Sequence, residues 1–234
     1  MNRGQISARV EARIDRTDST TTTLVDSMVN EVMREVEREY PWAYTKKSQT
    51  AAISANVKSF TLPSNLILHH PFTLLLEDAG TSATPEYTYM VKVEENFFDI
   101  NFPAPNTTGT EAAYWKLTGG TGGTGFDVYP VMDVAATLKI GSGHYYTTAF
   151  TSDSETSWLT DNQSDLLIDG VAAKLFEHYG EPQKADRAYF RFQELLEKAK
   201  RDQRKMDRFG RILRVKTMSD FPLSVMQKKK TYGF

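Results

Sequence analysis

The stretch that decides the fold is residues 163–199, QSDLLIDGVAAKLFEHYGEPQKADRAYFRFQELLEKA. Apolar residues recur in it at spacings of three and four, which places them on one face of a helix. Gly180 interrupts the pattern and suits a helix C-terminus, and Pro182 suits the first position of the next helix. The sequence therefore predicts helices over 163–180 and 182–209. Because the link between them is so short, we expect them to pack as antiparallel neighbours.

A similar stripe lies near the other end of the chain, at residues 19–40, with glutamates and arginines filling the opposite face. Pro41 ends this predicted helix, and a shorter helix is expected before it. An amphipathic helix of this length is not stable alone in water, so it needs a partner. We expect the three long helices to share one core, with these residues inside it: Val32, Val36, Leu175, Phe192 and Leu196.

The middle of the chain has the composition of a β domain. Short runs rich in β-branched and aromatic residues alternate with Gly, Pro, Asn and Ser. Residues 93–101, VEENFFDIN, are expected to add one helical turn. The predicted strands are Val57–Leu62, Phe72–Leu76, Tyr87–Val93, Ala113–Leu117, Phe126–Tyr129, Ala135–Ile140 and Tyr145–Phe150.

Residues 119–125, GGTGGTG, could be taken for a phosphate-binding loop. Such a loop requires a Gly-Lys-Ser/Thr sequence that opens a helix, whereas a strand-like segment follows here. The sequence therefore favours a flexible hairpin loop.

Together these patterns predict an α+β protein. We expect a helical bundle formed by both ends of the chain (residues 1–45 and 158–210). An inserted β-sandwich or barrel-like domain is expected at 46–157, and an extended C-terminal tail at 211–234.

Composition limits the class of protein. The 234 residues are 40% hydrophobic and 25% charged, which is typical of a globular chain that can bury a core. No cysteine is present, so disulfides and thiolate metal sites are excluded. No apolar run approaches the ~18 residues of a membrane span, and the N-terminus lacks the apolar segment of a signal peptide. We therefore expect no membrane association and a protein that stays in the cytoplasm where it is made.

The predicted tail, residues 211–234, differs in charge from the rest of the chain. It carries six basic residues and one acid, and because the net charge of the whole chain is −2, residues 1–210 carry about −7. Its bulky apolar residues follow neither a helical nor a strand period. A tail of this composition is expected to order on a partner, with its apolar residues filling separate pockets.

Catalytic chemistry is not indicated. The sequence contains no Gly-x-Ser-x-Gly elbow and no His-Glu-x-x-His motif. Adjacent His69 and His70 precede a proline in an expected turn, where their side chains diverge, so a metal site is not favoured. His178 suits a favourable interaction with the helix dipole. We expect no enzyme activity, no cofactor and no metal.

An alternative function is nucleic-acid binding through the last helix and the tail. The helix carries a dense basic series that could follow phosphates: Lys198, Lys200, Arg201, Arg204, Lys205 and Arg208. Against this, Glu194, Glu197, Asp202 and Asp207 intervene, as on a solvated helix face with many ion pairs. An interaction protein is therefore the favoured class.

Nearly the whole chain resembles the head-to-tail adaptor (connector, or head-completion) proteins of tailed bacteriophages. GQISARVEARID (4–15) and REYPWAY (38–44) resemble the N-terminal helices of that family. AAYWKLTGG (112–120) and FDVYPVMDVAATLKIGSGHYYTTAF (126–150) resemble its inserted β domain, which is podophage-like in size. Residues 152–196 resemble its closing helical pair.

The resemblance implies a structural virion protein at the head–tail junction, without catalytic activity. It implies a ring, expected to have 12 subunits, that lies beneath the portal and extends the DNA channel. Genomic DNA would pass without specific binding, and tail or nozzle proteins would attach below. Another tail or baseplate component remains an alternative. The residues expected to contact the portal or a neighbouring subunit are Ile212, Leu213, Phe221, Pro222, Leu223, Met226, Lys228, Lys229, Lys230, Tyr232 and Phe234.

Overall fold

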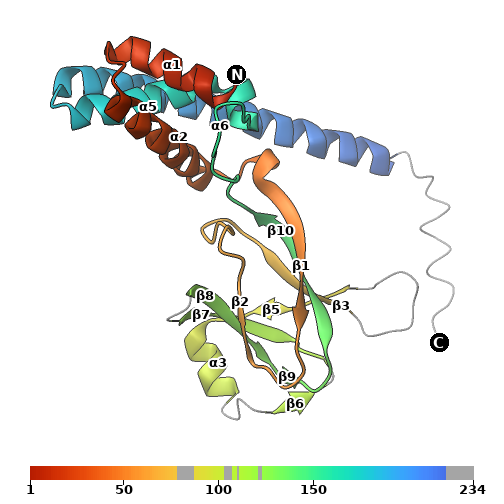
Figure 1. Cartoon of the computed structure of the whole chain (residues 1–234). Coiled ribbons are helices and arrows are strands. Elements are labelled where there is room, and N and C mark those ends of the chain that lie inside the picture. The colour runs from red at the N-terminus through yellow and green to blue at the C-terminus, as the bar shows by residue number, and fades with distance from the viewer. Residues whose placement is uncertain (78–86, 103–106, 110, 121–122, 220–234) are drawn as a thin grey trace. The chain divides into compact units, whose positions relative to one another are not determined.

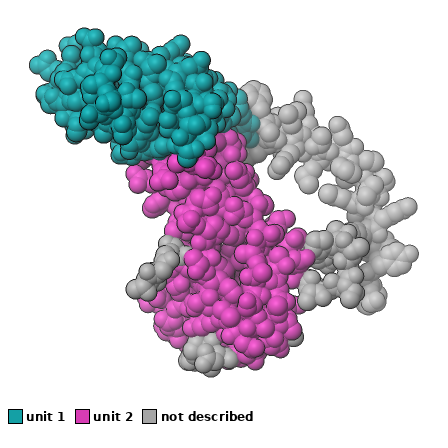
Figure 2. Space-filling view, viewed as in Figure 1, with its two compact units in different colours: residues 1–33, 150–234 teal, residues 34–149 magenta. Residues whose placement is uncertain are grey.

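A computed structural model describes the chain except residues 78–86, 103–106, 110, 121–122 and 220–234, and it leaves undescribed the side chains of 119–120, 123–124 and 208–219. The described chain divides into two compact units, residues 1–33 with 150–234 and residues 34–149 (Figure 2). The first unit is helical and the second is mainly β (Figure 1). The predicted α+β class is thus confirmed.

Six α-helices lie within the described ranges. They are α1 (Arg3–Ile14), α2 (Ser19–Glu39), α3 (Glu95–Asn101), α4 (Trp158–Asn162), α5 (Ser164–His178) and α6 (Pro182–Ser219), and a 3-10 turn spans Ala43–Thr45. The ten described strands are β1 (Lys46–Ile53), β2 (Ser59–Thr61), β3 (Thr73–Glu77), β4 (Tyr87–Tyr89), β5 (Val91–Lys92), β6 (Thr108–Gly109), β7 (Tyr114–Gly120), β8 (Gly123–Tyr129), β9 (Val131–Met132) and β10 (Ala136–His144).

The helical unit is held together by the stripes that the sequence predicts. Leu175, Phe192 and Leu196 are each at most 3% exposed. Gly180 has a positive φ of 72°, the conformation expected of a helix C-terminal glycine, and it reverses the chain between α5 and α6. Val32 of α2 lies directly against Gly170 of α5, so the first long helix does pack on the closing pair.

The end of the last helix was predicted wrongly. The sequence favours a stop near Phe209 and Gly210, whereas the backbone of α6 continues as helix to Ser219. The first nine residues of the predicted extended tail, 211–219, are therefore helical. One glycine costs a helix only about 1 kcal/mol, which the helix-forming residues on both sides of Gly210 can offset.

The β unit contains two four-stranded sheets, with strand orders β1-β10-β3-β4 and β2-β8-β7-β5. Most pairs are antiparallel, while β5–β7 and the small β6–β9 pair are parallel. Both large sheets contribute to one buried cluster, which includes Leu74 and Leu138 from the first and Trp115 and Phe126 from the second. The sandwich-like packing fits the prediction, but none of the described sheets closes into a barrel.

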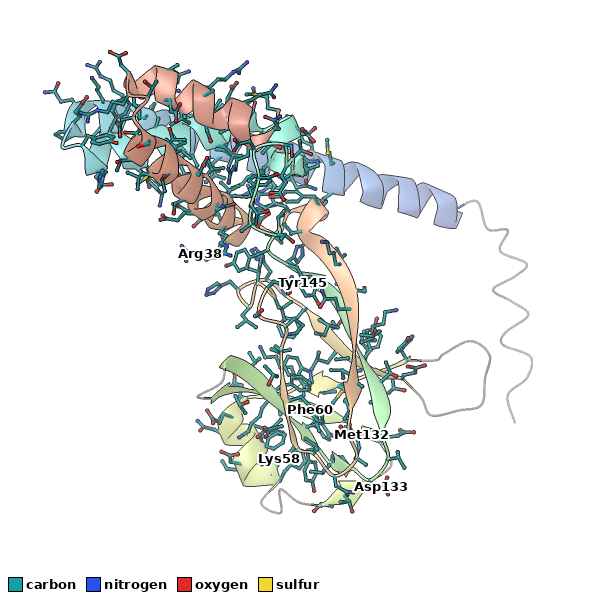
Figure 3. The ribbon with its side chains drawn as sticks, viewed as in Figure 1. Arg38, Lys58, Phe60, Met132, Asp133 and Tyr145 are labelled. Carbon is teal, nitrogen blue, oxygen red and sulfur yellow. The ribbon has the colours of Figure 1, made fainter. Side chains whose placement is uncertain are left out.

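Figure 3 shows side chains filling the space between these sheets, Met132 and Phe60 among them. The hairpin predicted around GGTGGTG is confirmed: β7 and β8 pair antiparallel as far as Gly120 opposite Gly123. The predicted strand at Tyr145–Phe150 is wrong, because only Tyr145 forms an isolated bridge there. Strand β1 was not predicted, since its sequence, KKSQTAAI, is largely polar and mostly exposed.

Candidate interaction surfaces

The residues predicted to contact a partner lie at or beyond the end of the described chain. Ile212 and Leu213 fall on the helical backbone of α6, in a part where side chains are not described. Phe221, Pro222, Leu223, Met226, Lys228, Lys229, Lys230, Tyr232 and Phe234 lie outside the described residues. The structure therefore does not test these assignments.

Helix α6 continues after its last described buried side chain. The last buried side chain described on α6 is Gln203, and the next four, 204–207, are exposed. Met206 is 66% exposed. Figure 1 shows the final turns of α6 running past α1 and α5. The described side chains of α6 after Gln203 are therefore outside the core of the helical unit.

Two of the basic residues of α6 pair with acids on the same helix. Lys200 pairs with Glu197 at 3.1 Å, and Lys205 pairs with Asp202 at 3.4 Å. Spacings of three residues bring such pairs together on a helix surface. This arrangement is the solvated, ion-paired face that the sequence offered as the alternative to a phosphate-binding surface.

A groove with a cationic rim crosses the helical unit. Its lining comes from α1, α5 and α6 and comprises Arg13, Phe176, Lys184, Asp186, Arg187, Ala188, Phe190 and Arg191. Arg13 and Arg191 both form ion pairs with Asp169, whose carboxylate is almost fully buried. A buried carboxylate between two partly exposed arginines is stabilised because each arginine also reaches water. This ion-paired group fixes α1 and α6 on α5.

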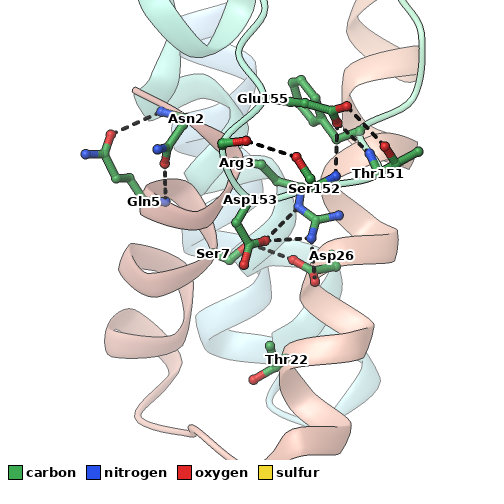
Figure 4. A network of polar contacts seen from close by, with 12 residues as sticks. Asn2, Arg3, Gln5, Ser7, Thr22, Asp26, Thr151, Ser152, Asp153 and Glu155 are labelled. Carbon is green, nitrogen blue, oxygen red and sulfur yellow. Dashed lines mark hydrogen bonds and ion pairs between the residues drawn. The ribbon is translucent and has the colours of Figure 1, made fainter.

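A second polar network fixes the start of α1 to the segment that precedes α4 (Figure 4). The guanidinium of Arg3 contacts Asp153 at 2.6 Å and Asp26 of α2 at 3.2 Å. Ser7 donates to the same Asp26 carboxylate at 2.9 Å. Glu155 accepts backbone hydrogen bonds from Ser152 and Thr151, and these bonds lower the pKa of its carboxyl. Charge-assisted bonds of this kind define the shape of an otherwise irregular segment.

In the β unit, the C-terminal end of α2 is anchored by a buried carboxylate. Glu37 is fully buried and accepts hydrogen bonds from the backbone N–H and the hydroxyl of Thr147, at 3.0 and 2.5 Å. Burial raises the pKa of Glu37, and the Thr147 bonds partly oppose that shift. Burial, with the nearby Glu37 charge second, also raises the pKa of Tyr44.

Two histidines meet near the backbone of Glu37. The rings of His70 and His144 lie edge to face with 5.3 Å between their centroids. His70 Nε2 contacts the Glu37 carbonyl at 3.0 Å, and His144 Nδ1 contacts the Thr45 hydroxyl at 2.9 Å. Burial lowers the pKa of His144, and the neighbouring His70 adds to the effect. His69 is exposed while His70 is buried, so the adjacent side chains diverge as predicted.

An aromatic group also covers one end of the second sheet. Phe102, just after α3, stacks on Tyr129 at 4.2 Å and lies 5.0 Å from the ring of Tyr114. Phe98 anchors α3 on its buried side and is 1% exposed. Phe97 and Ile100 of the same helix are 50% and 76% exposed. Sequence reasoning predicted the helix but not this surface, because exposure depends on which face β7 covers.

The described residues offer no group of three or more His, Asp or Glu placed to hold a metal ion. Within the same described ranges, none of the helices is both long and apolar enough to cross a membrane. What the described structure does present is apolar and charged surface on a helical unit and on a β unit. These are features of an interaction protein of the α+β class.

Comparison with known families identifies the family to which this interaction protein belongs. Residues 1–216 match the SU10 adaptor protein family, and since the match covers most of the chain, the protein belongs to that family. It is a phage head–tail adaptor, a structural component of the virion at the head–tail junction. No curated protein matches the chain. The predicted family resemblance is confirmed.

Proposed function

We propose that this adaptor forms a ring, with 12 subunits expected, beneath the phage portal. The ring extends the DNA channel and provides the platform to which tail or nozzle proteins attach. The single observation that carries this proposal is the family match over residues 1–216. The exposed apolar surfaces described above supply faces for subunit and tail contacts. The adaptor acts by binding alone, without catalysis.

The C-terminal residues 211–234 are the docking segment in this proposal. Gln203 is the last described buried side chain of α6, and in this proposal the segment that follows adds nothing to the core of the helical unit. The apolar residues of the segment are irregularly spaced, and Pro222 fixes the backbone dihedral φ at its own position. Side chains arranged in this way can insert one by one into separate pockets of a partner. The lysines at 228–230 raise the association rate and set the register of the bound segment more than they increase affinity.

Truncation tests this role directly. Chains ending at residue 210 and at residue 219 are compared with the full chain by thermal unfolding and by co-sedimentation with the portal of the same phage. Both truncated chains should keep the melting temperature of the full chain and should fail to attach to the portal or to one another. A truncated chain that still docks, or one that unfolds, contradicts the assigned role of the segment. Negative-stain images of the full chain with the portal should show the ring.

DNA passes through the ring without specific binding in this proposal. Residues 1–210 carry a net charge of about −7, which repels phosphate. Were the six basic residues of the tail to hold phosphates, the log–log dependence of affinity on salt would have a slope of about −5. We expect weak binding without sequence preference. A sub-micromolar complex at physiological salt that is lost with residues 211–234 would favour the nucleic-acid alternative.

A further inference from the structure

The strongest unexplained surface lies on α3 of the β unit, and we call it the α3 surface. It consists of Phe97, Ile100, Phe102, Tyr114, Glu95 and Asp99. Phe97 and Ile100 are three residues apart, so they lie on the same side of the helix. Their exposed fractions of 50% and 76% are high for large apolar side chains. Clustered exposed apolar residues mark an interaction site more often than scattered ones do.

The α3 surface is fixed in place before any partner arrives. Lys116 of β7 is 7% exposed, and its Nζ lies 2.8 Å from Asp99 and 5.0 Å from the centre of the Phe98 ring. The aromatic contacts of Phe102 hold the other end of α3 against β7 and β8. A partner therefore meets a rigid patch, which reduces the entropy lost on binding.

The charge around this patch is negative. Glu95 and Asp99 are 72% and 62% exposed at their side chains, and Glu94 immediately precedes the helix. The single Lys116 ammonium lies near both carboxylates of α3 but can balance only one charge. The patch therefore suits a partner that combines apolar side chains with positive charge.

One segment of this chain has that chemistry. Residues 220–234, DFPLSVMQKKKTYGF, contain three lysines and one acid among aromatic and aliphatic residues. The groove described above between α1, α5 and α6 has the cationic rim of Lys184 and Arg187 and would repel the lysines. We propose that residues 220–234 of one copy dock on the α3 surface of a second copy, with aromatic residues on Phe97 and Ile100 and the lysines beside Glu94 and Glu95.

The choice of a second copy rests on the ring of the proposed function, in which each subunit has a neighbour. Fifteen residues span at most about 50 Å when fully extended, and this length limits how far from the end of α6 the contact can lie. Docking of residues 220–234 on the next copy would give a head-to-tail contact, the type that closes rings.

Cross-linking tests the contact with high specificity, because the natural chain contains no cysteine. A full-length Ile100→Cys chain and a full-length Tyr232→Cys chain, differing in size by an affinity tag, are co-expressed and oxidised, with and without the phage portal. The expected product is a disulfide-linked pair of the two different chains. Tyr189→Cys, at a position 54% exposed on α6, replaces Ile100→Cys as the control. The yield with Ile100→Cys should exceed the control at least tenfold.

Charge reversal separates a specific contact from collision. K228E/K229E/K230E in the Tyr232→Cys chain should abolish the cross-link, and E94K/E95K in the Ile100→Cys chain should restore it. Equal yields with the control position, or no rescue by the second reversal, would overturn the proposal. A link formed only within a double-cysteine chain would place the segment on its own copy and would also overturn it. Loss of portal attachment in an intact, cross-linked ring would instead contradict the proposed function alone.

Discussion

Gly170 of α5 and Phe192 of α6 are in such close contact that a Cβ at position 170 would stand 2.9 Å from Cδ2 of the Phe192 ring. The same Cβ would stand 2.7 Å from Cγ1 of Val32. Three helices from the two ends of the chain therefore meet at one glycine. The absence of a side chain there sets how closely α2, α5 and α6 approach.

Gly170→Ala should destabilise the helical unit for this reason. Overpacking a filled core costs about 1–3 kcal/mol, and the helix preference of alanine over glycine returns up to about 1 kcal/mol. Urea unfolding should show a lower free energy of unfolding than the natural chain. The cost should be smaller when Val32→Ala is already present, because that change removes the methyl group in the way. Full additivity of the two substitutions would contradict the steric explanation.

Leu196→Ala should lower the free energy of unfolding by about 2–5 kcal/mol, as truncations in a packed core do. Leu196 is 2% exposed on the face of α6 that meets α5. The neighbouring Leu195 is only partly buried, so Leu195→Ala is the matched control and should cost clearly less. Equal losses measured by denaturant titration would show that α6 does not bury the predicted face.

Stability should fall below neutral pH because of His144. Burial and the nearby His70 and Lys46 lower its folded pKa below the ordinary 6.5. The unfolded chain therefore takes up this proton first, and the contribution to stability, complete above about pH 6.5, is lost as pH falls through the folded pKa. His144→Gln should flatten this part of the pH profile of the melting temperature. His69→Gln, at an exposed position, should leave the profile unchanged. A profile flattened by His69→Gln and not by His144→Gln would contradict the role of His144.

Glu37 should act in the opposite direction. Burial raises its folded pKa above the ordinary 4.5, so the folded state holds this proton more tightly than the unfolded state does. Stability should therefore fall as pH rises from about 4.5 through the folded pKa and then stay level. Glu37→Gln should remove this decline in a pH series of unfolding free energies. Glu194→Gln, at an exposed carboxylate on α6, is the control and should preserve it.

The sequence alone determined the long helices apart from the end of α6, the pairing of α5 with α6, and the α+β class. The 3.6-residue stripes at both ends and the Gly180–Pro182 break are local features, and local spacing is sufficient to place such elements. The runs of β-branched and aromatic residues that form β3, β7, β8 and most of β10 could also be predicted from the sequence. Strand β1 was not, because its polar side chains face water and its place is set by pairing with β10.

Only the tertiary structure decided which polar and exposed residues matter. Asp169 looks like any helix carboxylate in the sequence, yet two arginines from distant segments converge on it. Glu37 meets Thr147 across 110 positions of sequence, and His70 meets His144 across 74. The α3 surface exists because β7 covers Phe98 and leaves Ile100 in water. Local spacing fixes the faces of an element, whereas burial, pairing and pKa depend on what the rest of the fold places against each face.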